Sequence, residues 1–170
     1  MYRWVWSSQI MVIGCGNVLF GDDGFGPAVI EHLQTKYRLP DEIVLIDAGT
    51  SSGELLFDAL LSEDTPAMLI IIDAMDFGLE PGIVESIPLE AIPTKKLADF
   101  SVHQFPALDI LKELKERRGV DLRILACQVE SIPMEIRQGL SSSVARAVGQ
   151  TAKDIFEILC REVQTEVSRI

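Results

Sequence analysis

The stretch GCGNVLFGDDGFGPAV, residues 14–29, leads from a short apolar run into an amphipathic segment, with two adjacent aspartates between them. The run that ends in it, Gln9–Cys15, is apolar and rich in β-branched residues, which predicts a strand buried on both faces. The segment that follows, Gly26–Tyr37, predicts a helix, because apolar residues recur every fourth position from Phe25 and Pro27 falls in the first turn. This strand–loop–helix unit is typical of the start of an α/β fold.

The rest of the chain alternates strands and helices in the same way. The predicted strands are 42–48, 67–73, 83–87 and 122–128, and the predicted helices are 53–61, 104–118 and 141–167. This alternation predicts a three-layer α/β/α sandwich around a mostly parallel five-stranded sheet. The strand at 83–87 follows its predecessor after only a turn, so it can run antiparallel. At 170 residues, without repeats or linkers, the chain is expected to form a single domain, residues 1–170.

Charge and composition exclude several classes of partner. The chain has 26 acidic and 15 basic residues and a formal charge of -11, which opposes binding to a nucleic-acid backbone. No apolar run reaches the roughly 20 residues that a membrane span needs, and the N-terminus lacks a signal-peptide pattern. We therefore expect a cytoplasmic protein with neither a nucleic-acid nor a membrane partner. Cys15, Cys127 and Cys160 lie far apart without a CxxC pair, which predicts reduced thiols.

The glycine loop does not fit a phosphate site. Gly14 and Gly16 have the spacing of a dinucleotide-binding loop, but Leu19 stands where the third glycine is needed, and the helix begins only near Gly24. The adjacent aspartates would also repel a pyrophosphate. A phosphoryl-accepting receiver domain likewise has an acidic pair after its first strand, but it needs a lysine after its fifth strand. The corresponding sequence here, ILACQVES, has none.

Acidic and imidazole side chains follow the ends of three predicted strands or connections. Asp22 and Asp23 follow the first strand, Asp73 ends the third, and His103 ends the long loop before a helix. Because the carboxyl ends of parallel strands meet at one edge of the sheet, Asp23, Asp73 and His103 can converge on one zinc, nickel, cobalt or iron ion. Alternatively, one aspartate of the pair caps the helix and Asp73 only begins a turn. The spacing leaves both interpretations open.

Four segments in the same order resemble one known family. The run VIGCGNVLFGDDGFGPAVIEHL, residues 12–33, closely resembles the opening of the nickel-iron hydrogenase maturation endopeptidases, with a GxGN strand end, an acidic pair and a G-x-G helix start. The segments DAGTSSGELL at 47–56, IIIDA around Asp73 and SVHQF around His103 are similar to later segments of that family. The segments GDDGFG and HQFPALD are most similar to the branch of the family that serves coenzyme F420-reducing hydrogenases.

The resemblance implies an endopeptidase that removes the C-terminal extension of a nickel-loaded hydrogenase large-subunit precursor. It implies that Asp23, Asp73 and His103 contact nickel carried by the precursor. Because the sequence lacks HExxH, GxSxG and a Cys–His nucleophile arrangement, we expect Asp23 and Asp73 to be the catalytic residues, either one acting as general base on water. The family often has glutamate at the first of these positions, so Asp23 is one methylene shorter and Asp22 is the alternative ligand. A nickel-binding hydrogenase-assembly chaperone without catalytic activity would use the same three residues.

Overall fold

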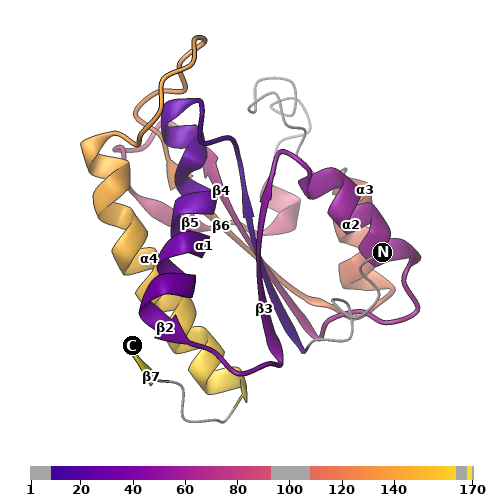
Figure 1. The fold of residues 1–170 in the computed structure, drawn as a ribbon. Coiled ribbons are helices and arrows are strands. Elements are labelled where there is room, and N and C mark those ends of the chain that lie inside the picture. The colour runs from indigo at the N-terminus through magenta and orange to yellow at the C-terminus, as the bar shows by residue number, and fades with distance from the viewer. Residues whose placement is uncertain (1–8, 93–107, 164–167, 170) are drawn as a thin grey trace.

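The computed structural model describes residues 9–92, 108–163 and 168–169 (Figure 1). A five-stranded sheet runs through its centre in the order β3-β1-β4-β6-β5. Its strands are β1 (Ile10–Cys15), β3 (Ile43–Gly49), β4 (Met68–Met75), β5 (Val84–Ser86) and β6 (Asp121–Gln128). The pairs β1–β3, β1–β4 and β4–β6 are parallel, whereas β5 pairs antiparallel with β6. The mostly parallel sheet with one antiparallel strand is therefore confirmed.

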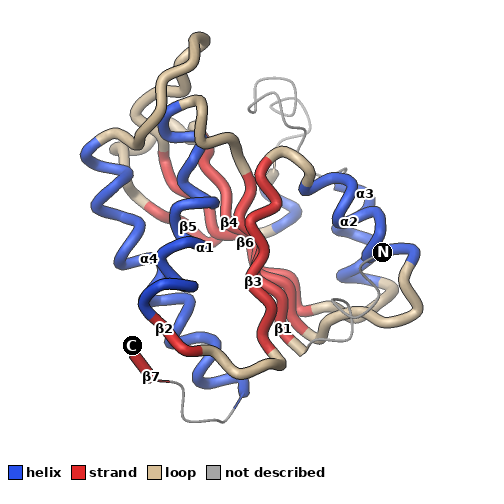
Figure 2. Tube along the Cα trace, viewed as in Figure 1, coloured by secondary structure: helices blue, strands red, loops and turns tan. Residues whose placement is uncertain are grey.

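Helices cover both faces of this sheet and complete the three layers (Figures 1 and 2). The four helices of the described residues are α1 (Phe25–Lys36), α2 (Ser52–Leu61), α3 (Leu108–Glu116) and α4 (Ser142–Val163). Helices α1 and α4 pack on one face and α2 and α3 on the other, each pair enclosing its own apolar core. The predicted sandwich is thus the observed fold. None of the described helices is long and apolar enough to cross a membrane.

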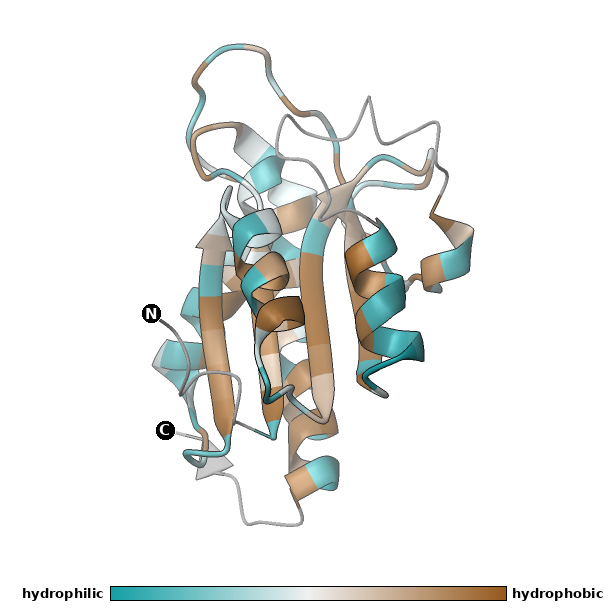
Figure 3. Ribbon diagram, turned by 90° about the vertical axis from the view of Figure 1, so that its right-hand side faces the viewer, coloured by the Kyte–Doolittle hydropathy of each residue, from teal (hydrophilic) through white to brown (hydrophobic). Residues whose placement is uncertain are grey.

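The two central strands, β1 and β4, are buried along their whole length. Met11 and Ile13 point into the core beneath α2 and α3, and Ile10 and Val12 point into the core beneath α1 and α4. Apolar side chains consequently follow one another along most of both strands, up to Asp73 near the end of β4, and Figure 3 shows the strands as mainly brown with teal only near their ends. This explains why the continuous apolar runs predicted these strands.

Two glycines bring the start of α1 directly against the sheet. A Cβ atom on Gly26 would lie 2.3 Å from the carbonyl oxygen of Cys15 and 2.6 Å from that of Ile72. A Cβ atom on Gly14 would lie 2.5 Å from the carbonyl oxygen of Gly26. Any larger residue would push the helix away, so these glycines fix the position of the loop between β1 and α1.

Some short elements were not predicted from the sequence. The two-residue strands β2 (Tyr37–Arg38) and β7 (Ser168–Arg169) pair antiparallel, and the 3-10 helices η1 (Gly21–Gly24) and η2 (Leu89–Ala91) lie in connections. The predicted cap of the last helix is confirmed, because the Ser141 hydroxyl accepts a hydrogen bond from the Val144 N–H at 3.5 Å.

The order of the strands locates the edge where a ligand is expected. From β1 the chain first adds β3 on one side and then returns to add β4 on the other side of β1. The carboxyl ends of β1 and β4 therefore form the switch point at which open α/β sheets bind their ligands.

Candidate active site

The two adjacent aspartates lie in η1, in the connection that leads from the carboxyl end of β1 to α1. Both carboxyl groups are almost fully buried, at 1% exposure each. Helix α1 has Gly24 as its N-cap residue, and no side chain forms a cap hydrogen bond there. The interpretation of these aspartates as helix caps is therefore wrong, and each has a separate environment.

Asp23 is held by the GxGN turn that precedes it. The Asn17 N–H donates a hydrogen bond to Oδ2 of Asp23 at 2.8 Å. Gly16 has a φ of 121°, and a Cβ atom there would lie 1.9 Å from the carbonyl oxygen of Asp23. Only glycine fits this position. No sequence pattern indicated this role of Gly16 and Asn17, which together hold the Asp23 side chain in position.

Asp22 points in another direction and binds the connection between β6 and α4. Its Oδ2 accepts hydrogen bonds from the N–H groups of Glu130 (2.8 Å) and Ser131 (3.4 Å), and its Oδ1 accepts one from Ser141 (2.6 Å). Both carboxylate oxygens are thus engaged by the backbone. This makes Asp22 a structural residue and a poor substitute for Asp23 as a metal ligand.

Asp73 lies near the end of β4 on the face that α2 covers. Its side chain is buried, and its Oδ1 accepts a hydrogen bond from the Ala74 N–H at 2.8 Å. Burial raises the pKa of the Asp73 carboxyl to about 7 against the opposing effect of that hydrogen bond, and the charge of Asp23 raises it further. The two carboxyl groups therefore interact at one edge of the sheet. A strongly perturbed carboxyl group of this kind is typical of functional sites.

Cys15, at the end of β1, faces the same region. Burial, followed by the charge of Asp73, holds the pKa of its thiol well above its usual range. A thiol that stays protonated is a weak nucleophile, and Cys15 belongs to the apolar core beneath α2 and α3.

The structure places two of the three predicted ligands. His103 lies outside the described residues, and the described residues contain no group of three His, Cys, Asp or Glu side chains that could hold a metal ion. The role of Asp23, Asp73 and His103 as a metal site stays a prediction.

Gln128 organises the turn beside Asp73, a role that no sequence pattern indicated. Its Nε2 donates to Oδ1 of Asp76 at 3.0 Å, and its Oε1 accepts from the N–H groups of Phe77 (2.6 Å) and Leu79 (3.2 Å). Asp76, which is exposed, also accepts from the Gly78 N–H at 3.0 Å. Asp76 therefore shapes the turn after β4.

An open groove of about 390 Å³ adjoins η1. The groove is lined by residues of the β1–α1 connection, of α1, of β3 and of the segment before α4: Val18, Gly21, Gly24, Pro27, Ala28, Ile30, Glu31, Gln34, Asp47, Gly139 and Leu140. A sheet that buries two interacting carboxyl groups at its switch point, next to an open groove, has the features of an α/β enzyme that works by acid–base chemistry.

Comparison with known proteins defines the kind of enzyme. The family model of the hydrogenase maturation proteases matches residues 27–158. The chain is 39% identical over 157 residues to a Methanocaldococcus jannaschii protein named as a putative hydrogenase maturation protease, covering 92% of this chain and 97% of that protein. It is 31% identical over 156 residues to the coenzyme F420 hydrogenase subunit delta of Methanothermobacter thermautotrophicus, covering 89% and 95%. The chain belongs to the hydrogenase maturation protease family.

Solved structures agree with this assignment. The hydrogenase-maturating endopeptidase HybD of E. coli superposes with a TM-score of 0.71 at 28% identity, covering 95% of this chain and 96% of that one. The hydrogenase maturation protease HycI of Thermococcus kodakarensis gives 0.67 at 26% identity, covering 89% and 92%. The resemblance seen in the sequence is confirmed, and the protein is a hydrolase of the endopeptidase class.

Proposed function

We propose that this endopeptidase removes the C-terminal extension of a hydrogenase large-subunit precursor in the cytoplasm after nickel has been inserted. The proposal rests on one observation above all: Asp23 and Asp73, from two different strand ends, are buried together and interact electrostatically. Buried acidic groups in proximity are costly unless a cation or a proton compensates them. A metal ion carried by the substrate would supply that compensation when the precursor binds.

The residue types suit nickel. Carboxylate oxygens and an imidazole form a mixed oxygen and nitrogen ligand set, which binds borderline divalent ions such as nickel. Asp23, Asp73 and His103 would contact the ion while the precursor supplies its remaining ligands. The ion would then mark a precursor as ready for cleavage and orient its scissile peptide.

The proteolytic step needs a base. Cys15 is buried and protonated, so a carboxylate is the better candidate among the described residues at this edge. Asp23 or Asp73 would take a proton from the water that attacks the scissile carbonyl, an effect that contributes roughly 100-fold to 10,000-fold when the base is well placed. The similarity to a coenzyme F420 hydrogenase subunit supports a hydrogenase of that branch as the substrate.

Cleavage of a nickel-loaded precursor by single variants tests this function. We expect Asp23→Asn, Asp73→Asn and His103→Ala each to lower the cleavage rate by roughly 100-fold or more, because each removes a metal contact or the base. Two variants serve as matched controls. Asp76→Asn changes an exposed carboxylate but keeps the side-chain oxygen that accepts the hydrogen bond from the Gly78 N–H, and His32→Ala changes the histidine on α1. A precursor without nickel is expected to stay uncut.

Two results would contradict the proposal. Full activity of the Asp23 and Asp73 variants would show that these residues are not needed for cleavage. Equal cleavage of precursors with and without nickel would show that the protein does not recognise the metal. Nickel-dependent precursor binding without any cleavage by the unaltered protein would instead support the assembly-chaperone alternative.

A further inference from the structure

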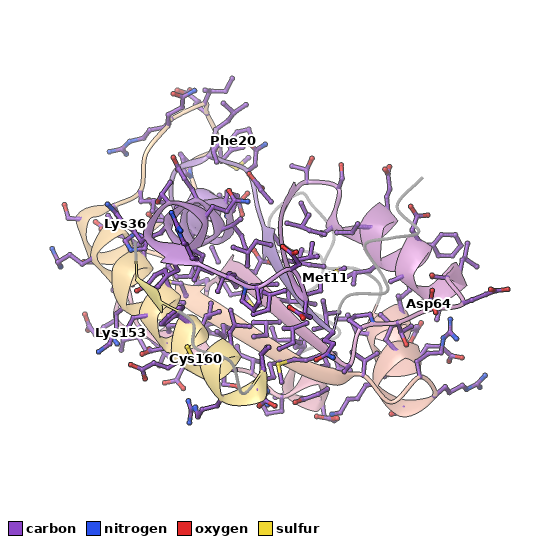
Figure 4. All side chains as sticks on the ribbon, turned by 60° about the horizontal axis from the view of Figure 1, so that its bottom comes forward. Met11, Phe20, Lys36, Asp64, Lys153 and Cys160 are labelled. Atoms are coloured by element: carbon purple, nitrogen blue, oxygen red, sulfur yellow. The ribbon has the colours of Figure 1, made fainter. Side chains whose placement is uncertain are left out.

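Residues 130–141, which make up most of the connection between β6 and α4, project beyond the carboxyl edge of the sheet as an arm. Figure 1 shows this 130–141 arm in orange above the start of α1, and Figure 4 shows Phe20 near its base and side chains fanning outward at its tip. At the tip, Met134 is 97% exposed and Ile136 is 71% exposed. Neither side chain belongs to the two apolar cores of the chain, so their exposure calls for another explanation.

The base of the arm is firmly attached next to the candidate active site. Asp22 accepts hydrogen bonds from backbone N–H groups at both ends of the arm. Arg137 adds two backbone bonds, accepting from the Gly21 N–H at 2.7 Å and donating to the Leu19 carbonyl at 2.8 Å. A ring atom of Pro133 would lie 3.0 Å from a Cβ atom on Gly21, so the arm packs closely on η1. The apolar tip is therefore presented on a fixed support, which lowers the entropic cost of binding a partner.

The charges around the tip indicate what the partner is like. Glu130, Glu135 and Arg137 are exposed on the arm, and the groove lined by Gly139 and Leu140 also has Glu31 and Asp47 on its walls, so acidic groups outnumber basic ones around the tip by four to one. An apolar centre with acidic surroundings is complementary to an apolar patch bordered by basic residues. A second copy of this chain, with a formal charge of -11, is disfavoured as the partner.

We propose that the 130–141 arm is a docking element for the folded body of the precursor, whose apolar, basic-rimmed patch packs on Met134 and Ile136. This inference rests on the proposed function, because it takes Asp23 to be part of the active site. The arm lies next to that site because it is bound by Asp22, which precedes Asp23 in the chain. Docking on the arm would hold the body of the precursor while its C-terminal segment reaches the carboxylates. Asp22 is then a positioning residue that couples the docking element to the active site.

Binding of uncut, nickel-loaded precursor tests the arm directly. All proteins carry Asp23→Asn, so that the precursor stays uncut, and the test protein adds Met134→Ser and Ile136→Ser. The matched control adds Phe57→Ser and Leu61→Ser on α2, which are 50% and 68% exposed. We expect the arm variant to bind the precursor about tenfold more weakly and the control to bind unchanged. With Asp23 intact, the same arm changes should raise KM about tenfold and leave kcat unchanged.

The possible outcomes separate the two proposals. Equal affinity of the arm variant and the unaltered arm overturns the docking element. Self-association that disappears with the arm changes, measured by sedimentation, also overturns it, because the tip would then bind a second copy. In a third outcome, the precursor binds in an arm-dependent way, but the protein with Asp23 intact never cleaves it. This outcome would support the docking role of the arm and contradict the proposed function.

Discussion

Asp22 and Asp23 are neighbours in sequence, equally buried, and chemically different in their surroundings. The difference comes from the 3-10 turn of η1, which directs the first carboxylate toward the backbone N–H groups of the 130–141 arm and the second toward the Asn17 N–H. The sequence shows an acidic pair but not these directions, because the donors to Asp22 lie more than 100 residues away along the chain. The residue types of the site were thus predictable from the sequence, but the different roles of Asp22 and Asp23 were not.

The raised pKa of Asp73 makes stability depend on pH. Below the usual pKa of 3.8 the carboxyl is protonated in both states, whereas between 3.8 and about 7 only the unfolded form has lost its proton. Stability is therefore lost as pH rises through this range, at about 1.4 kcal/mol per pH unit, and the loss ends near pH 7. Between pH 5.5 and pH 8.5 the free energy of unfolding of the metal-free protein should fall by about 2 kcal/mol, and that of the Asp73→Asn variant should not fall by this amount.

Urea unfolding at both pH values measures this difference. In the Asp73→Asn variant the side-chain amide oxygen can still accept the hydrogen bond from the Ala74 N–H, so the variant should fold normally. Asp64→Asn, a change at an exposed carboxyl group, is the control and should follow the unaltered protein. Parallel stability curves for Asp73→Asn and the unaltered protein would show that this carboxyl has an ordinary pKa.

The environment of Asp22 leads to a prediction about the attachment of the arm. Asp22→Ala would leave the N–H groups of Glu130, Ser131 and Ser141 without their acceptor, which should cost about 3 kcal/mol of unfolding free energy. Amide hydrogen exchange should also accelerate at Ser141. The exposed Asp41→Ala change should do neither. An unchanged exchange rate at Ser141 would mean that the arm is held without Asp22.

At the scale of elements, the glycines at the β1–α1 junction should be the least replaceable residues of the fold. Gly26→Ala places a methyl group against the carbonyl oxygens of Cys15 and Ile72, and we expect a loss of about 3 kcal/mol as α1 shifts outward. Gly53→Ala in α2 is the control, because a Cβ atom there meets nothing within 4 Å and should stabilise the helix by roughly 0.5–1 kcal/mol. Thermal unfolding of both variants checks this contrast. Equal changes in stability for Gly26→Ala and Gly53→Ala would contradict it.

The elements themselves were predicted well where burial is continuous. The predicted strand 42–48 differs from β3 by one residue at each end, and the predicted strand 122–128 differs from β6 by one residue at its start. The pairing of β2 with β7 was missed because each strand has two residues and its partner lies at the other end of the chain. The helix predicted from Gln104 begins within residues that the structure does not describe, and its described part starts at Leu108. Periodicity thus finds long elements, whereas short pairings depend on distant contacts.

At the scale of the whole molecule, burial predicts where unfolding begins. Strands β1 and β4 lie in the middle of the sheet with every residue buried, whereas β5 is a short strand at its edge. In native-state hydrogen exchange, the amides of Val12 and Ile71 should exchange only by global unfolding. The Ile87 amide, which donates to the Ile124 carbonyl beside β5, should exchange through a local opening that costs less free energy.

This gradient bears on the active site because Asp73 lies in β4 and Asp23 lies in the connection that follows β1, and these are the two strands that should open last. Their carboxyl groups would keep their relative position while the edge of the sheet fluctuates, as preorganised acid–base chemistry requires. If Val12 and Ile71 exchanged as fast as Ile87, the central strands would open together with the edge. The burial of the two carboxylates would then be lost in every such opening, and their interaction could not be a fixed property of the site.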